Sequence, residues 1–93
     1  MILEIVSPEA KLYSGEVISV AVPGIDGEFQ MLNHHAAIVS ILTKGFIKVD
    51  SKIFNATKEG AALFELHVDR RQYLPIESGT LEMNDNKIII LVD

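Results

Sequence analysis

Hydrophobic and polar residues alternate with a period of two along most of the chain. In residues 46–53 and again in residues 61–68, apolar side chains occupy every second position and polar ones mostly fall between them. The apolar faces consist of Ile47, Val49 and Ile53 in the first segment and of Ala62, Phe64, Leu66 and Val68 in the second. This spacing predicts half-buried antiparallel strands, and the turn-forming residues 55–60 between them predict one long hairpin over 46–68.

Similar alternation or short apolar runs predict the other strands. They cover residues 2–7, 15–24, 28–32, 36–43, 73–78, 80–83 and 88–92. The inward face of residues 15–24 is expected to consist of Ile18, Val20 and Val22. Pro75 predicts an edge strand or a bulge, because proline cannot donate to a sheet ladder. The Asn- and Asp-rich residues 84–87 predict a compact turn.

The whole pattern predicts an all-β protein. Nine or ten short strands with turn signals between them are typical of a β-sandwich or a barrel. No window of 11 residues carries an apolar stripe at helical spacing. We therefore expect residues 1–93 to form one domain, with no linker and no internal repeat.

Charge and composition narrow the possible partners. The chain has 8 Lys and Arg against 13 Asp and Glu, a net charge of −5, which argues against binding to nucleic acid. The only basic pair, Arg70 and Arg71, follows Asp69 and predicts a solvated turn. There is no cysteine, signal peptide or apolar run of the ~20 residues that a membrane helix needs. Contact with a membrane is therefore expected only through a partner.

Residues 24–37, with the sequence GIDGEFQMLNHHAA, hold the main candidates for chemistry. His34 and His35 are adjacent, so on a strand they would point to opposite faces. A zinc site needs three or four ligands; His67 is the only other histidine, and the acids nearby in sequence are Asp26 and Glu28. Surface or interface histidines are therefore favoured over a metal site.

The chain shows no motif of a known catalytic class. There is no Gly-x-Ser-x-Gly, His-Glu-x-x-His or phosphate-binding loop, so we expect no catalytic residue and no cofactor. Gly24 and Gly27 permit the tight reversal between two strands. Glu28 follows this reversal and is expected to be exposed, either as a solubilising charge or as a contact at the loop end.

Three segments in order carry a family resemblance. They are LEIVSPEAKLYSGEVISVAVPG (3–24), DGEFQMLNHHAAIVSILTKGFIKV (26–49) and IESGTLEMNDNKIIILVD (76–93). Ser-Pro-Glu, Ser-Gly-Glu-Val, Val-Pro-Gly, Gly-Glu-Phe and His-Ala succeed one another at similar spacing in the N-terminal β-sandwich of the epsilon subunit of F-type ATP synthase. The chain resembles this family over most of its length, and residues 50–75 are the unmatched part.

The chain departs from the family pattern in one loop above all. Asn33 and His34 stand where the family usually has Pro-Gly, and Ala37 replaces a proline. Gln30 and Thr80 each replace a glycine. The loop therefore keeps the family histidine, His35, but loses the prolines that stiffen it.

The resemblance implies a fold and a role. The fold would be an antiparallel β-sandwich of about ten strands. The role would be that of a non-catalytic rotor subunit in the central stalk of a proton-translocating ATP synthase, at the cytoplasmic face of the bacterial inner membrane. It would link the gamma subunit to the membrane c-ring and couple ion flow to ATP synthesis. Longer members continue into two helices that can inhibit hydrolysis, and a chain that stops at Asp93 is expected to lack them.

The resemblance also assigns contact residues. Residues 24–37 would form a loop and a strand at the end of the sandwich that faces the ring. Gly27 and Glu28 match the contact with the c-ring, and His35 and Ser40 match positions beside the gamma subunit. Candidate apolar anchors are Phe29, Met31, Leu32 and Tyr73, for which core packing is the favoured alternative. Two other classes stay open: a free-standing sandwich that binds a ligand with its end loops, and a small metalloprotein.

Overall fold

Ten strands and one short helix make up the computed structural model, which describes all 93 residues. The elements are β1 (Ile2–Val6), β2 (Lys11–Glu16), β3 (Ser19–Gly24), β4 (Gly27–Leu32), β5 (Ile38–Leu42), β6 (Gly45–Asp50), α1 (Lys58–Ala61), β7 (Glu65–Leu66), β8 (Gln72–Ile76), β9 (Gly79–Asn84) and β10 (Lys87–Val92). The predicted all-β class and the number of strands are confirmed.

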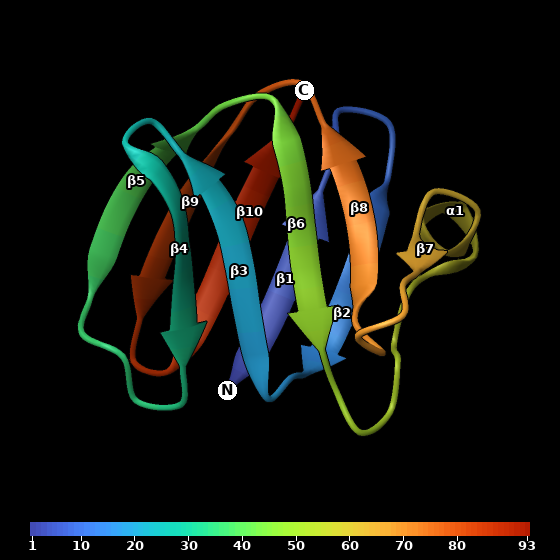
Figure 1. Ribbon diagram of the computed structural model, residues 1–93, viewed down its shortest axis with the longest axis horizontal. Coiled ribbons are helices and arrows are strands. Elements are labelled where there is room, and N and C mark those ends of the chain that lie inside the picture. Colours follow the sequence, from blue (N-terminus) through green and yellow to red (C-terminus); the bar gives the residue numbers. More distant parts are fainter.

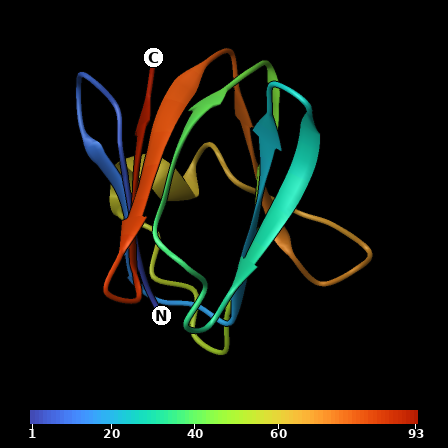
Figure 2. The same cartoon turned by 90° about the vertical axis from the view of Figure 1, so that its left-hand side faces the viewer.

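The strands form two layers that face each other (Figures 1 and 2). One layer has the order β2-β1-β10-β9-β5, and the other has the order β4-β3-β6-β8-β7. A single pair, Gly24 with Leu42, joins the layers at one corner. All neighbours run antiparallel except β1 and β10, which are parallel. The predicted β-sandwich is confirmed with this one exception.

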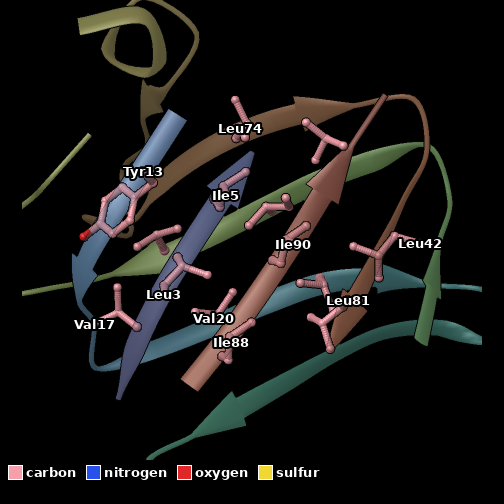
Figure 3. Packing of buried hydrophobic residues seen from close by; sticks show 14 of the residues in the cluster. Leu3, Ile5, Tyr13, Val17, Val20, Leu42, Leu74, Leu81, Ile88 and Ile90 are labelled. Atoms are coloured by element: carbon pink, nitrogen blue, oxygen red, sulfur yellow. The ribbon is translucent and has the colours of Figure 1, made fainter. Parts of the chain in front are cut away.

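The core lies between the two layers. It contains 18 buried apolar residues, to which β1 and β10 contribute their inward alternate positions (Figure 3). Leu3 and Ile5 lie beside Ile88 and Ile90, and all four are fully buried. Across from them, side chains such as Val20 and Leu74 come from the second layer. The period-two pattern thus arises because one face of each sheet is removed from water.

The predicted strand over residues 15–24 is wrong in its bounds. The structure has two strands here, β2 and β3, and the sequence pattern missed most of β2. The backbone N–H of Ile18 donates to Asp50 O at 2.7 Å, and its side chain is 45% exposed rather than inward. Val20 and Val22 are buried as predicted.

The predicted hairpin over residues 46–68 is also wrong. β6 pairs with β3 and β8, whereas the short β7 pairs with β8. Ile47 and Val49 are buried as expected, but the other predicted inward residues lie largely outside the core. Ile53, Ala62, Leu66 and Val68 are exposed, and Phe64 is half-buried.

Contacts with β2 explain why this segment does not form a strand. The Thr57 hydroxyl accepts from Gly60 N at 3.0 Å, which caps α1, and donates to Lys11 O at 2.6 Å. The Thr57 amide donates to Leu12 O at 3.0 Å. Phe54 and Phe64 pack edge to face, with ring centroids 4.9 Å apart, and both lie against Tyr13. The segment therefore closes one side of the sandwich.

Two local predictions are confirmed. Asp85 and Asn86 both have positive φ, at 50° and 60°, in the two-residue turn that joins β9 to β10. This is the geometry of a type I′ hairpin turn, in which Asn and Asp are favoured. Pro75 lies in β8, which β7 covers only at Tyr73 and Gln72, so the proline sits on an open edge.

The close packing of α1 against β2 can be tested at Gly60. A Cβ at this position would lie 1.9 Å from Leu12 O, so Gly60→Ala must displace α1 from β2. We expect a loss of about 3 kcal/mol in the free energy of unfolding, measured with urea. The neighbouring exposed substitution Glu59→Ala should change it by less than about 0.5 kcal/mol. Equal stability of the two variants would contradict the close approach.

Candidate interaction surface

β4 carries most of the predicted site, and its position follows from the hairpin that it forms with β3. The two-residue tip Ile25–Asp26 is followed by Gly27, whose φ of +117° suits glycine alone. From this tip β4 runs to the opposite end of the sandwich (Figure 1). Met31 is fully buried and is a core residue, whereas Leu32 is 53% exposed.

The structure brings three of the four predicted contact residues together. Gly27, Glu28 and Ser40 line one depression of about 590 Å³ between β4 and β5. Its other lining residues are Ile25, Asp26, Phe29, Val39 and Ile41. His35 does not lie there, because residues 33–37 connect β4 to β5 at the far end of the sandwich (Figure 1). Residues 24–37 thus do not gather at one end, contrary to the expectation from the sequence.

Glu28 does not stand alone on the surface. Its carboxylate lies 2.8 Å from Lys48 Nζ, and the side chain is about half exposed. Lys48 in turn lies over the ring of Tyr73, 5.1 Å from its centroid. Glu28 is therefore held in place and partly neutralised, which the sequence did not indicate because Lys48 lies on β6.

Hydrogen bonds hold the loop that joins β4 to β5. His34 adopts a φ of 65°, and its amide donates to Asn86 Oδ1 at 2.7 Å. Asn86 Nδ2 donates to Asn33 Oδ1 at 2.8 Å, and His35 N donates to Leu32 O at 3.1 Å. The turn between β9 and β10 thus fixes this loop. Both histidines are exposed, and no three His, Asp or Glu residues in the structure are grouped to hold a metal ion.

A second polar cluster lies around Tyr73 on β8. Its ring stacks on that of His67 with centroids 3.5 Å apart, and its hydroxyl donates to Asp69 Oδ2 at 2.7 Å. Arg71 Nε donates to the same carboxylate at 2.9 Å. The bond from Tyr73 and the backbone bond from Arg71 lower the pKa of Asp69 to about 2. Arg71 is thus paired, while Arg70 is exposed at the turn with a φ of 69°.

The order of the strands in the two layers, with the parallel pair of β1 and β10, defines a β-sandwich domain. The family described as ATP synthase, Delta/Epsilon chain, beta-sandwich domain matches residues 1–62. The chain belongs to this family. No helix in the structure has the length and apolar character required to span a bilayer.

Curated relatives extend this similarity along the whole chain. The ATP synthase epsilon chain of Campylobacter curvus is 32% identical over 91 residues, which are 98% of this chain and 59% of that protein. The epsilon chain of Helicobacter pylori is 28% identical over 91 residues, 98% of this chain and 61% of that one. The chain therefore spans about three-fifths of the length of these relatives.

Solved structures share the fold. A chain in the central stalk and c-ring structure of Tetrahymena thermophila mitochondrial ATP synthase superposes with a TM-score of 0.74 at 15% identity. That match covers 99% of this chain and 62% of the other. A chain of Euglena gracilis mitochondrial ATP synthase gives a TM-score of 0.72 at 20% identity, covering 99% and 49%.

The lowered pKa of Asp69 predicts how stability depends on pH. Because the folded-state pKa lies below the ordinary 3.8, ionised Asp69 stabilises the fold above that value, and the contribution disappears as the pH falls toward about 2. The Asp69→Asn variant should therefore lose less stability than the wild type between about pH 5 and about pH 2.5, measured by urea unfolding. The Asp26→Asn control removes an exposed carboxylate without an ion pair and should keep the wild-type slope. Equal slopes in all three proteins would contradict the assignment.

Proposed function

We propose that the chain is the β-sandwich of an epsilon-type, non-catalytic subunit in the central stalk of an F-type ATP synthase. The observation that carries this proposal is membership of the Delta/Epsilon family, supported by relatives named ATP synthase epsilon chain. The similar fold in a central stalk and c-ring assembly supports the same role. Residues 1–93 would act as one domain that links the gamma subunit to the c-ring.

The sandwich suits a part that transmits torque. Two sheets packed at interior density deform little, so rotation of the ring would reach the shaft rather than be lost in flexing. Proton flow would turn the ring, and ATP would be made at sites on other subunits. The chain would lie at the cytoplasmic face of the bacterial inner membrane and meet the membrane only through the c-ring.

The positions of the contact residues suggest how the two partners divide the surface. Gly27 and Glu28 lie beside the β3–β4 tip, where the loops of the ring would bind. Ser40 lies in β5, and His35 precedes this strand at its other end. A contact with the gamma subunit that includes both would therefore extend from the loop between β4 and β5 onto β5.

Co-elution tests the link to the gamma subunit. We expect the chain and the gamma subunit of the same organism to form a complex on size exclusion at micromolar concentration, because a lasting interface should bury more than about 1,000 Å². Two separate peaks would contradict the rotor role and favour a free-standing binding module.

Reversal of charge at Glu28 tests the contact with the ring. In the Glu28→Lys enzyme we expect weaker attachment to the ring and less proton-driven ATP synthesis in membrane vesicles. The substitution also breaks the ion pair with Lys48, so Lys48→Met is the matched control that breaks the pair but keeps the carboxylate. Synthesis should fall in the first variant and persist in the second. Unchanged synthesis in the Glu28→Lys enzyme would exclude this role for the carboxylate.

A further inference from the structure

The two lateral sides of the sandwich differ in how they are closed. On one side, residues 55–57 of the chain itself run along the outer edge of β2. Ser14 N donates to Asn55 O at 3.3 Å, Thr57 N donates to Leu12 O at 3.0 Å, and Tyr13 and Ala56 form a β-bridge. An extended segment with apolar neighbours thus covers this edge. On the other side, between β4 and β5, no segment of the chain does the same.

The backbone of β4 offers a free edge on this open side. Pro23 has no N–H, and its carbonyl accepts from Thr43 N at 2.8 Å, away from β4. Its partner Glu28 is therefore in a non-hydrogen-bonded pair of the β3–β4 ladder. By alternation, Glu28, Gln30 and Leu32 direct their N–H and C=O groups outward. The Leu32 carbonyl is used by His35 N, while those of Glu28 and Gln30 have no partner strand.

The surroundings of this edge are apolar and lack the usual protection. Natural edge strands are commonly blocked by lysine, proline or a bulge. β4 and β5 contain no lysine and no proline, and the single charge, Glu28, is paired with Lys48. On β5, Val39 is 79% exposed and Ile41 is 60% exposed.

We propose that the outer edge of β4 receives an extended strand of a protein partner, which adds to the sheet by β-augmentation. Main-chain bonds to Glu28 and Gln30 would give affinity, as in other complexes of this type. Alternate apolar side chains of the added strand would enter the depression beside Phe29 and Ser40. This inference rests on the proposed function, since it places the gamma subunit on the depression that holds Ser40, one of the two positions proposed beside that subunit.

Charge favours a different protein over a second copy of this chain. Asp26 lies at the lip of the depression, is exposed and takes part in no ion pair, so the added strand should carry Lys or Arg at that end. In an antiparallel pair of two β4 edges centred on Gln30, Glu28 of one copy would lie opposite Leu32 of the other. No cation of β4 would meet Asp26, and both copies carry a net charge of −5.

Two substitutions at Gln30 distinguish the contribution of its backbone to binding from that of its side chain. Gln30→Pro removes the outward N–H and costs no hydrogen bond of the β3–β4 ladder, and proline is tolerated on open edges. Gln30→Ala removes the side chain and keeps the N–H. With the gamma subunit as the probe, we expect the proline variant to bind at least about tenfold more weakly and the alanine variant to bind within about threefold of the wild type. In the wild-type complex, hydrogen exchange at the Gln30 amide should slow.

The outcomes of these experiments test β-augmentation at β4 separately from the proposed role in the central stalk. Urea unfolding of both variants checks that each is folded before binding is compared. Wild-type binding by the folded proline variant, or no slowing of exchange at Gln30, would overturn β-augmentation and leave the stalk role intact. Failure of the wild type itself to bind would overturn the link to gamma and this occupant of the edge. A wild-type dimer that Gln30→Pro abolishes would assign the edge to a second copy instead.

Discussion

The parallel pairing of β1 with β10 is the interaction on which the rest of the sandwich depends. It joins the first strand of the sequence to the last, with Leu3 beside Ile88 and Ile5 beside Ile90. These two strands form the centre of one layer, and β2 and β9 extend it on either side. The second layer packs against the inward side chains of these two strands. All five strands of that second layer, β3, β4, β6, β7 and β8, come from the chain between them.

The sequence predicts an element well where the local pattern and burial in the fold agree. β9 alternates between polar and apolar residues, β10 is a short apolar run, and the turn between them has residues that suit its geometry, so all three are recognisable. Residues 61–68 alternate in the same way but do not form a strand with β6. The reason lies in β2: Thr57 caps α1 and also bonds to Lys11 O, 46 residues away. The periodicity of a short sequence segment does not reveal such a long-range contact.

The same distinction applies to the candidate surface. The exposed position of Glu28 follows from the glycines of the hairpin tip, and its assignment came from the family resemblance. The ion pair with Lys48 and the hydrogen bond from His34 to Asn86 join residues 20 and 52 positions apart. The ion pair fixes a side chain of β4, and the hydrogen bond fixes the loop between β4 and β5. The openness of the edge of β4 likewise depends on which strands do not pair, and a sequence pattern carries no such information.

The pairing of the first strand of the sequence with the last also governs when this layer can form during synthesis. A ribosome releases β1 first, but its parallel neighbour emerges only after residue 87. Until then Leu3 and Ile5 lack the apolar side chains of β10 beside them, and the backbone groups of β1 on that side have no partner strand. This layer can therefore be completed only after nearly the whole segment has been translated, and such non-local pairing is intrinsically slow.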